Sequence, residues 1–400
     1  MAETRIPSAH SAATSTNSIR PIRAATGALT TTIAVSVPVF LVGGLAVQIG
    51  DELGFSPAGL GLAVSAYFGA SALASVPAGA LVERYGSTRI SRCGIALAAM
   101  SLIGIAVAAN ALWSLVAILA LGAGANAMGQ LASNTSLSRH VPARRQGLSF
   151  GVKQAAIPVS TLLAGAAVPA VALTVGWRWA FVLAGVLAAG AILLVPGEPG
   201  GGRRSRDHAA KQATGALVVI GVAATLAAAA ANALGTFLVD SAVARGIGPG
   251  SAGLALTLGS AVCVAARILG GWQADRHPGR QVGVIAGLLA CGAVGLLLFA
   301  VPGTFPLVAG VVLGFGLGWS WPGLMNFAVV RLHPQAPAAA TSITQTGVYA
   351  GGCVGPLGLG ALASIAGYPT MWVVAAAAML TAGILMLVGS RLLRSHPAAG

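Results

Sequence analysis

The chain has 400 residues, of which 56% are apolar and only 8% are charged, and its mean hydropathy is +0.87. A soluble globular domain carries charge at about a quarter of its positions, so this composition excludes an ordinary water-soluble fold. The net charge of +14 does not indicate a nucleic-acid binder, because the Lys and Arg residues are scattered in short groups between apolar stretches. The composition therefore predicts a membrane protein.

Apolar stretches long enough to cross a bilayer, which takes about 20 residues of helix, follow one another along the chain. They fall at 27–49, 57–80, 89–108, 112–138, 146–173, 178–196, 214–240, 250–273, 281–301, 305–330, 338–366 and 369–393. We therefore predict an all-α membrane protein with twelve transmembrane helices. The expected organisation is a disordered cytoplasmic tail (1–24), a six-helix bundle (25–196), a cytoplasmic linker (197–213), a second six-helix bundle (214–393) and a cytoplasmic tail (394–400).

The distribution of Lys and Arg predicts the orientation in the membrane. All but four of these 22 residues fall in the termini or in loops on one side of the predicted helices. Of the four, Arg178 and Arg245 lie on the other side, and Lys153 and Arg267 lie within helices. Because Lys and Arg stay on the cytoplasmic side, both termini are expected in the cytoplasm. The high Ala and Gly content is typical of a bacterial chain, so we expect the plasma membrane of a bacterium.

The two halves of the sequence are related by a shift of 192 residues. Residues that rarely match by chance coincide at this offset, namely Pro57 with Pro249, Gly61 with Gly253, Gly79 with Gly271, Glu83 with Asp275, Asn134 with Asn326 and Arg139 with Arg331. Internal repeats of this kind are typical of secondary transporters, whose substrate site lies between the repeats near the middle of the bilayer.

The loop after the second predicted helix carries a motif that occurs twice. It reads Gly79-Ala-Leu-Val-Glu83-Arg84-Tyr-Gly86-Ser-Thr-Arg89, and its degenerate copy contains Arg267, Gly271, Asp275 and Arg276. This pattern resembles the signature of the major facilitator superfamily, and residues 150–158 with Gly176-Trp177-Arg178-Trp179 resemble a bacterial branch of it. The resemblance implies a twelve-helix transporter of two pseudo-symmetric bundles.

The same resemblance implies a conformational latch at the helix ends. Its expected members are Gly79, Glu83, Arg84, Gly86, Arg89, Arg267, Gly271, Asp275 and Arg276. Glycine lets two helices approach closely, and a carboxylate near a helix end pairs with Arg or meets a positive helix N-terminus. The alternative is that the arginines only mark the cytoplasmic side.

Polar residues recur at helical spacing within several predicted spans, where they are costly and usually face a cavity or the protein interior. The fourth span places Asn126, Gln130 and Asn134 on one face, and the seventh places Asn232, Thr236 and Asp240 on one face. The tenth offers Trp319 and Asn326, with Trp321 nearby. In the superfamily these helices line the cavity, so the stripes are predicted to bind substrate. Hydrogen bonds that only join the helices are the alternative.

Lys153 is the only Lys within a predicted span, and its repeat mate is Gln345, with Tyr349 one turn further on. We expect these three residues to contribute to substrate binding, with Lys153 attracting an anionic group such as a carboxylate. Lys153 lies roughly 11 Å from the helix start, at 1.5 Å per residue. The alternative is therefore that its side chain extends to the cytoplasmic interface.

None of the eight acidic residues falls at the predicted middle of the membrane. Asp240 is the leading candidate for proton coupling, and the alternative is an ordinary residue at the outer end of its helix, facing Arg245. All six His residues lie in tails or loops, and we find no metal-ligand spacing, nucleophile motif or phosphate-binding loop. An enzyme, a metal site and a cofactor are therefore not expected.

The predicted function is secondary active transport of a small organic solute, with an anion favoured, by alternating access. A drug or natural-product efflux antiporter is the first alternative, and a non-transporting membrane sensor is the second. The expected partners are a small-molecule substrate, the surrounding lipid, and protons or a counter-solute. No nucleic acid is expected, and the protein is expected to be a monomer.

Overall fold

The computed structural model of the 400-residue chain describes residues 13–197, 215–277, 281–332 and 337–395. All regular elements within these ranges are helices. The first half contains α1 (Ala13–Gly44), α2 (Ala46–Leu53), α3 (Pro57–Tyr85), α4 (Ser87–Ala108), α5 (Leu112–Gly122), α6 (Gly124–His140), α7 (Gln146–Ala167) and α8 (Trp177–Ala191). A short π-helical stretch, η2 (Val168–Ala172), extends α7, and 3-10 turns precede α7 (η1, Ala143–Arg145) and follow α8 (η3, Ile192–Leu194).

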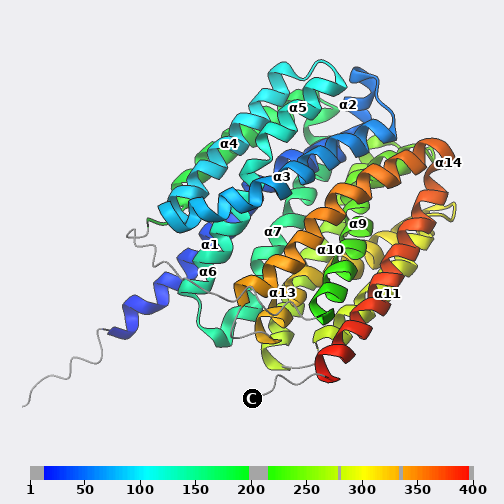
Figure 1. Cartoon of the computed structure of the whole chain (residues 1–400). Coiled ribbons are helices and arrows are strands. Elements are labelled where there is room, and N and C mark those ends of the chain that lie inside the picture. Colours follow the sequence, from blue (N-terminus) through cyan, green and yellow to red (C-terminus); the bar gives the residue numbers. More distant parts are fainter. Residues whose placement is uncertain (1–12, 198–214, 278–280, 333–336, 396–400) are drawn as a thin grey trace, which may run out of the picture.

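The second half repeats this order of spans. It contains α9 (Gly215–Val243), α10 (Pro249–Arg276), α11 (Gln281–Leu298), α12 (Thr304–Gly310), the π-helical η4 (Val311–Gly318), α13 (Trp321–Leu332) and α14 (Pro337–Ser395). The two halves form two bundles that lie side by side along the membrane-spanning direction (Figure 1).

Each of the twelve predicted spans has its helix. By length and composition, eleven continuous helices among the described residues are apolar enough to cross a membrane, and the last of them runs over 49 residues, Thr344–Leu392. Gly367, with φ 80° and ψ 165°, divides this helix into two passes. Positive φ is accessible mainly to glycine, and Gly54 and Gly246 have positive φ at equivalent turns, 192 positions apart. The repeat therefore extends to the backbone of the turns.

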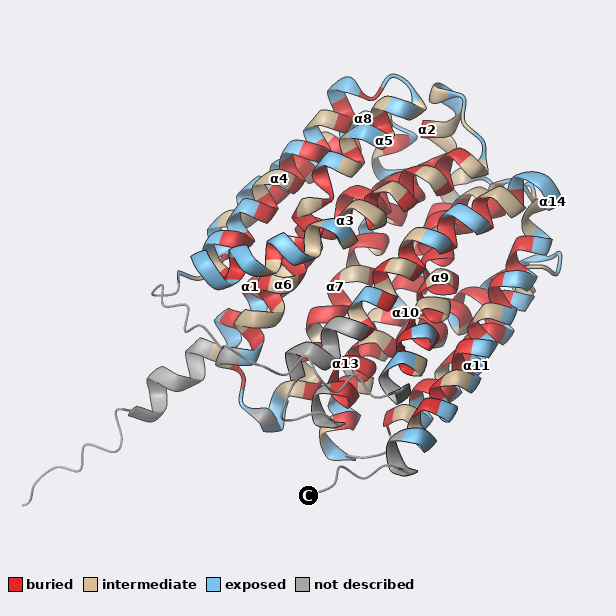
Figure 2. Ribbon diagram, in the orientation of Figure 1, coloured by how far each residue is buried: buried red, intermediate tan, exposed pale blue. Residues whose placement is uncertain are grey.

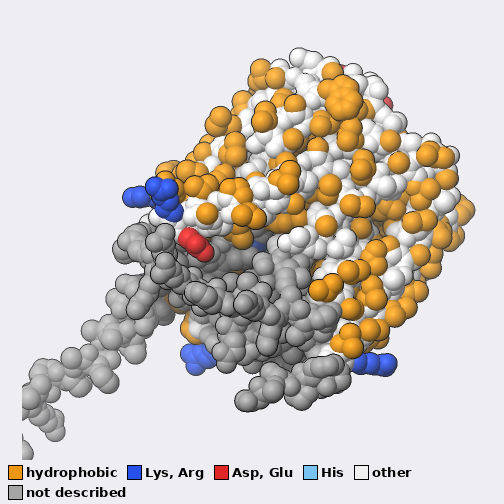
Figure 3. Space-filling view, in the orientation of Figure 1, with side chains coloured by type: hydrophobic (Ala, Val, Ile, Leu, Met, Phe, Trp, Pro, Cys, Tyr) orange, Lys and Arg blue, Asp and Glu red, His pale blue; other side chains and the backbone are white. Residues whose placement is uncertain are grey.

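The outer surface is that of a protein solvated by lipid. Buried residues concentrate where helices face one another, and exposed residues lie on their outward faces (Figure 2). Large apolar side chains are among the most exposed, such as Leu193 and Ile365, both 86% exposed. In the view of Figure 3, apolar side chains are spread over the whole described part of the face, and the Lys and Arg that are clearly visible lie near its lower and left edges. A water-exposed surface would not carry so many exposed apolar side chains.

The two ends of the molecule differ in charge. We call the end that carries Arg84, Arg89, Arg144, Arg145 and Arg276 the basic end, and the opposite end, with the turns at Gly54, Gly176, Gly246 and Gly367, the far end. The first described residues of α1 and the last described residues of α14 lie at the basic end (Figure 1).

The first helix begins earlier in the structure than the predicted start of the first bundle. Residues 1–24 were expected to form a disordered tail, but α1 begins at Ala13 and continues without interruption into the first span. Once a helix has nucleated, each further residue is added at little cost, and the polar residues before Pro21 are compatible with helix. The predicted linker 197–213 and the last residues of the predicted tail 394–400 lie mostly outside the described residues.

Candidate transport site

A cavity lies between the two bundles, near the middle of the membrane-spanning helices. Its volume is about 60 Å³, counted as the space open to the centres of water molecules, and it is lined from both halves by α1, α3, α6, α7, α9, α10, α13 and α14. The polar or charged lining includes Asn126, Gln130, Gln154, Asn232, Arg267, Asn326 and Gln345. The aromatic lining consists of Phe40, Tyr67, Phe68, Trp319, Trp321 and Tyr349.

The structure brings together most of the residues that the sequence predicts to bind substrate. Those in the cavity wall are Asn126, Gln130, Asn232, Trp319, Asn326, Gln345 and Tyr349. Asn134 lies one turn beyond Gln130 on α6, toward the basic end, and its Oδ1 atom is buried without a hydrogen-bond donor. Lys153 lies behind the wall and reaches the site through Gln130. The fourth, seventh and tenth spans thus each contribute to the cavity wall, whereas Thr236 and Asp240 of the predicted stripe on the seventh span are not part of it.

Lys153 is 1% exposed, and its ammonium group donates a hydrogen bond to Oε1 of Gln130. Its side chain therefore turns into the bundle and does not extend to the membrane surface. Among the described residues, no carboxylate lies within ion-pair distance of Lys153. A buried cation of this kind needs an anionic partner or strong hydrogen bonds to offset its loss of hydration.

Arg267 does not lie where the sequence pattern predicts, and this is a correction. It was expected in the latch, but its side chain is 2% exposed and lies in the central cavity. The guanidinium donates from Nε (3.0 Å) and Nη2 to the carbonyl oxygen of Trp319, and from Nη1 to that of Gln154. The cause is depth, because Arg267 precedes Arg276 by nine residues, or roughly 13 Å of helix at 1.5 Å per residue.

The aromatic lining groups around Trp319. The ring centroids of Phe40 and Phe315 lie 5.7 Å and 5.4 Å from that of Trp319, in edge-to-face geometry, and the guanidinium carbon of Arg267 lies 5.6 Å from the Trp319 ring. This cluster joins α1 of the first half to η4 and α10 of the second half. It therefore places a cation beside aromatic rings in the middle of the cavity.

The lining residues that the sequence pattern did not single out include Phe40, Tyr67, Phe68 and Gln154. Gln154 follows Lys153 directly and is a polar residue within a predicted span, so its polarity could have indicated that it lines the cavity. The three aromatic residues gave no such signal, because an aromatic residue in an apolar helix faces lipid, core or cavity with the same local sequence.

The far end of the cavity is closed by close contacts between helices of opposite halves, each at a glycine. A Cβ atom on Gly43 of α1 would lie 2.4 Å from the carbonyl oxygen of Gly235 on α9, and one on Gly61 of α3 would lie 2.2 Å from that of Pro356 on α14. A Cβ atom on Gly165 of α7 would lie 2.5 Å from the carbonyl oxygen of Gly253 on α10. Only glycine permits backbones this close, so these contacts seal the far end.

At the basic end, the seam between α7 and α10 stays closed. Asp275 accepts hydrogen bonds from the backbone N–H groups of Gly147 and Leu148, both at 2.9 Å, at the start of α7. A Cβ atom on Gly271 would lie 2.6 Å from the carbonyl oxygen of Gly147. The carboxylate thus meets a positive helix N-terminus, one of the two arrangements that the motif predicts. The Arg276 guanidinium packs over Trp272, 3.7 Å from the ring centroid.

The equivalent seam between α3 and α14 is different. From Gly61 to Gly69 the two helices are in contact, but further toward the basic end Val76 is 83% exposed and a Cβ atom on Gly79 would meet nothing within 4 Å. Figure 1 shows α3 and the first part of α14 separating in this direction. Among the described residues, no basic side chain lies within ion-pair distance of Glu83. Arg84 packs over Tyr85, and Arg89 is exposed.

At the far end, Asp240 accepts a hydrogen bond from the Tyr368 hydroxyl, which follows Gly367. Arg245 donates to the carbonyl oxygen of Val301, so the expected pair of Asp240 with Arg245 is not formed. Asp240 is thus held within its own half at the far end, away from the central cavity.

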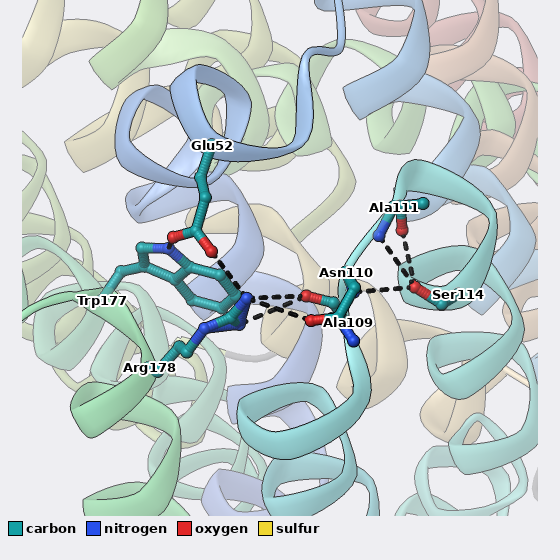
Figure 4. Close-up of polar contacts among 7 residues, drawn as sticks. All are labelled: Glu52, Ala109, Asn110, Ala111, Ser114, Trp177 and Arg178. Carbon is teal, nitrogen blue, oxygen red and sulfur yellow. Dashed lines mark hydrogen bonds and ion pairs between the residues drawn. The ribbon is translucent and has the colours of Figure 1, made fainter.

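The first half has a similar arrangement at its far end. Glu52 accepts hydrogen bonds from Trp177 Nε1 and Arg178 Nη2, both at 2.6 Å, and Trp177 follows Gly176 as Tyr368 follows Gly367 (Figure 4). The same guanidinium donates to the carbonyl oxygen of Ala109 and packs over the Trp177 ring at 4.3 Å. In both halves, a carboxylate on the first helix or its extension is therefore tied to the aromatic residue that begins the last helix.

The comparison with known families agrees with this architecture. The profile of the Major Facilitator Superfamily matches residues 26–219 and again residues 220–399. The two matches together cover nearly the whole chain and coincide with the two bundles. The chain belongs to the Major Facilitator Superfamily and is a membrane transporter of that superfamily.

Proposed function

We propose that the protein is a secondary transporter of a small organic anion, and that a carboxylate group of the substrate is the counterion of Lys153 and Arg267. One observation carries this proposal. Both cations are buried inside the membrane-spanning helices, and among the described residues neither has a carboxylate within ion-pair distance. Charges inside a membrane protein usually pair with one another or mark a substrate pathway.

The electrostatic argument favours an anion over a neutral or cationic solute. Among the described residues, Arg267 donates to neutral carbonyl oxygens and lies beside the Cys263 thiol, and Lys153 donates to a neutral amide. A positively charged solute would add repulsion to two uncompensated charges in a medium of low dielectric constant. A carboxylate supplies the missing negative charge and accepts several hydrogen bonds at once.

Because the far end is closed, substrate would reach the cavity from the basic end in this conformation, as a transport cycle by alternating access requires of one of its two states. Closure there depends on backbone contacts at Gly43, Gly61 and Gly165, whereas α3 and α14 separate beyond Gly69. Substrate would enter between these two helices, and the far end would open when the same glycine contacts part.

We also propose that the basic end faces the cytoplasm of a bacterial cell, which the Lys and Arg distribution supports. A membrane-impermeant thiol reagent added to intact cells should label a cysteine introduced by mutation in the loop 109–111. It should not label a cysteine introduced in the loop 141–145. The opposite pattern would reverse the orientation.

The direct test is uptake by proteoliposomes that contain the purified protein. A panel of radiolabelled carboxylates, their neutral amides and simple sugars should give uptake of at least one carboxylate and not of its amide. Lys153→Gln should reduce this uptake about 10- to 100-fold, because a hydrogen bond to a charged group contributes about 1.5–3 kcal/mol. Lys153→Arg should retain more uptake than Lys153→Gln.

Arg391→Gln is a matched control, because it removes one positive charge from an exposed position near the end of α14. It should leave uptake unchanged. Uptake of neutral solutes alone, or equal uptake by the Lys153→Gln variant, would contradict the proposal. Binding of a carboxylate without any uptake would favour a sensor over a transporter.

Proton coupling through Asp240 is a separate proposal, supported by the hydrogen bond from Tyr368 that holds this carboxylate within the membrane-spanning region. If Asp240 carries the coupled proton, an imposed pH gradient should accelerate uptake in the wild type and not in Asp240→Asn. Acceleration in both would exclude this role.

A further inference from the structure

The indole N–H of Trp321 is a buried hydrogen-bond donor without an acceptor. Trp321 begins α13, is 1% exposed and lines the central cavity, and its Nε1 atom has no hydrogen-bond partner. By contrast, Trp177 donates its indole N–H to Glu52. Buried donors in proteins nearly always have an acceptor. A buried donor in the cavity wall that has no acceptor in this conformation becomes available to a ligand when the walls move apart, so it indicates that a ligand supplies the acceptor.

The wall around this donor is unusually aromatic for the chain. Aromatic residues make up 5% of the sequence, but six of the twenty residues that line the cavity are aromatic. They come from both halves, with Phe40, Tyr67 and Phe68 in the first half and Trp319, Trp321 and Tyr349 in the second. Aromatic rings favour offset or edge-to-face contact with a further ring, so this wall fits a planar cargo better than a flexible aliphatic one.

The cation and the rings are neighbours. The guanidinium of Arg267 lies 5.6 Å from the Trp319 ring, whose other neighbours include Phe40. A ligand that places its acid group at Arg267 would therefore place the adjoining atoms against aromatic carbon. An acid group attached directly to a ring meets both requirements.

The size of the cavity limits the cargo. The space is about 60 Å³ here, compared with the cavity of about 150 Å³ that holds benzene in an engineered protein core. The walls must therefore move apart when even one ring enters, and the separated seam between α3 and α14 allows such movement. A fused ring system would require a much larger displacement.

We propose that the cargo is a monocyclic aromatic carboxylate, and that Trp321 determines specificity by donating its indole N–H to a carboxylate oxygen of that cargo. This inference rests on the proposed function, because it assigns the acid group to Lys153 and Arg267. To the proposed function it adds that the substrate carries an aromatic ring, that this ring is single, and that Trp321 donates a hydrogen bond to a carboxylate oxygen of the substrate.

The test uses benzoate as the probe, with binding to the purified full-length protein measured by calorimetry. Cyclohexanecarboxylate has the same acid group on a non-planar ring, benzamide lacks the charge, and 2-naphthoate has a second ring. Benzoate should bind at least about fivefold more tightly than cyclohexanecarboxylate and 2-naphthoate, because ring stacking and size both favour it, and benzamide should not bind measurably.

Trp321→Phe keeps an aromatic ring and removes the N–H group. It should weaken benzoate binding about tenfold, since the donor and the oxygen it serves are both buried. Trp372→Phe is the matched control. Trp372 is also fully buried with an unpartnered Nε1 atom, but it packs on Phe299 and lies outside the cavity wall. It should leave benzoate binding unchanged.

The outcomes separate the two proposals. If aliphatic carboxylates bind as tightly as benzoate and Lys153→Gln abolishes their binding, the aromatic inference is wrong and the anion proposal stands. If no carboxylate binds, both are wrong. An equal loss in Trp321→Phe and Trp372→Phe would overturn the role of Trp321, and the wild-type ligand series decides the cargo class even where a variant does not fold.

Discussion

The far-end seal makes a sharp prediction for Gly61, which lies where α3 crosses α14. A Cβ atom added there would lie 2.2 Å from the carbonyl oxygen of Pro356 and 3.4 Å from the Cα atom of Gly360. Both neighbours are backbone atoms, which do not rotate away as the end of a flexible side chain does. Gly61→Ala must therefore move the two helices apart or shift the protein to a conformation in which they are already apart.

The magnitude follows from the cost of overpacking, which is about 1–3 kcal/mol for an inserted methyl group. The clash exists only while the far end is closed. The substitution therefore destabilises that conformation relative to the one with an open far end, by a factor of about 5 to 150 in the equilibrium constant.

Cys353 is a natural reporter of this seam. It is partly buried in α14, its carbonyl oxygen accepts the Ser65 hydroxyl, and a Cβ atom on Gly69 would lie 3.2 Å from its Sγ atom. In a protein with Cys93→Ala and Cys291→Ala, a membrane-impermeant maleimide added to the outer face of intact cells should modify Cys353 faster after Gly61→Ala. The expected increase in rate is at least about fivefold, matching the lower limit of the conformational shift.

Gly79→Ala is the matched control on the same helix, because a Cβ atom there would meet nothing within 4 Å. It should not raise the labelling rate of Cys353. An unchanged rate in Gly61→Ala, measured on protein that is still folded, would refute the view that backbone contact at Gly61 closes the far end. An equal increase in the labelling rate of Cys353 in Gly79→Ala would also refute this view.

Two further substitutions test the ends of the first bundle. Asp275→Asn removes the charge that caps the start of α7 at Gly147, a contact worth about 1.5–3 kcal/mol. Labelling of the buried Cys263 from the basic side of inverted vesicles should therefore rise about tenfold. If the labelling rate does not rise, the cap does not hold the seam between α7 and α10 closed. Glu52→Gln breaks the ion pair with Arg178. The Glu52 side chain is 49% exposed and the Arg178 side chain is 31% exposed. The substitution should cost about 1 kcal/mol or less, lowering the thermal midpoint slightly without changing uptake, and a large loss of uptake would contradict a purely local role.

Much of the architecture could be predicted from local sequence. The twelve spans follow from runs of apolar residues, since a bilayer requires about 20 such residues for each helix. The repeat was visible because residues such as Glu83 and Asp275 rarely coincide by chance. The polar stripes on the fourth and seventh spans indicated which helix faces turn inward, because polar side chains are expensive in lipid.

The site itself was only partly predictable. Asn126, Gln130 and Asn232 were found because each is polar in an apolar helix. Arg267 was assigned to the wrong place because its motif lies near a loop, although its position more than two turns before Arg276 already indicated depth. Phe40 gave no signal, because an aromatic side chain is favourable in lipid, in a core and in a cavity alike.

Only the tertiary structure decided how the two repeats differ. The sequence relates Gly79 to Gly271 and Glu83 to Asp275, and it gives no reason to treat the pairs differently. In the structure, Gly271 packs against α7 and Asp275 caps it, whereas Gly79 contacts nothing. The physical reason is that such a repeat is compatible with two arrangements of nearly equal free energy, and local sequence cannot state which one the packed helices adopt.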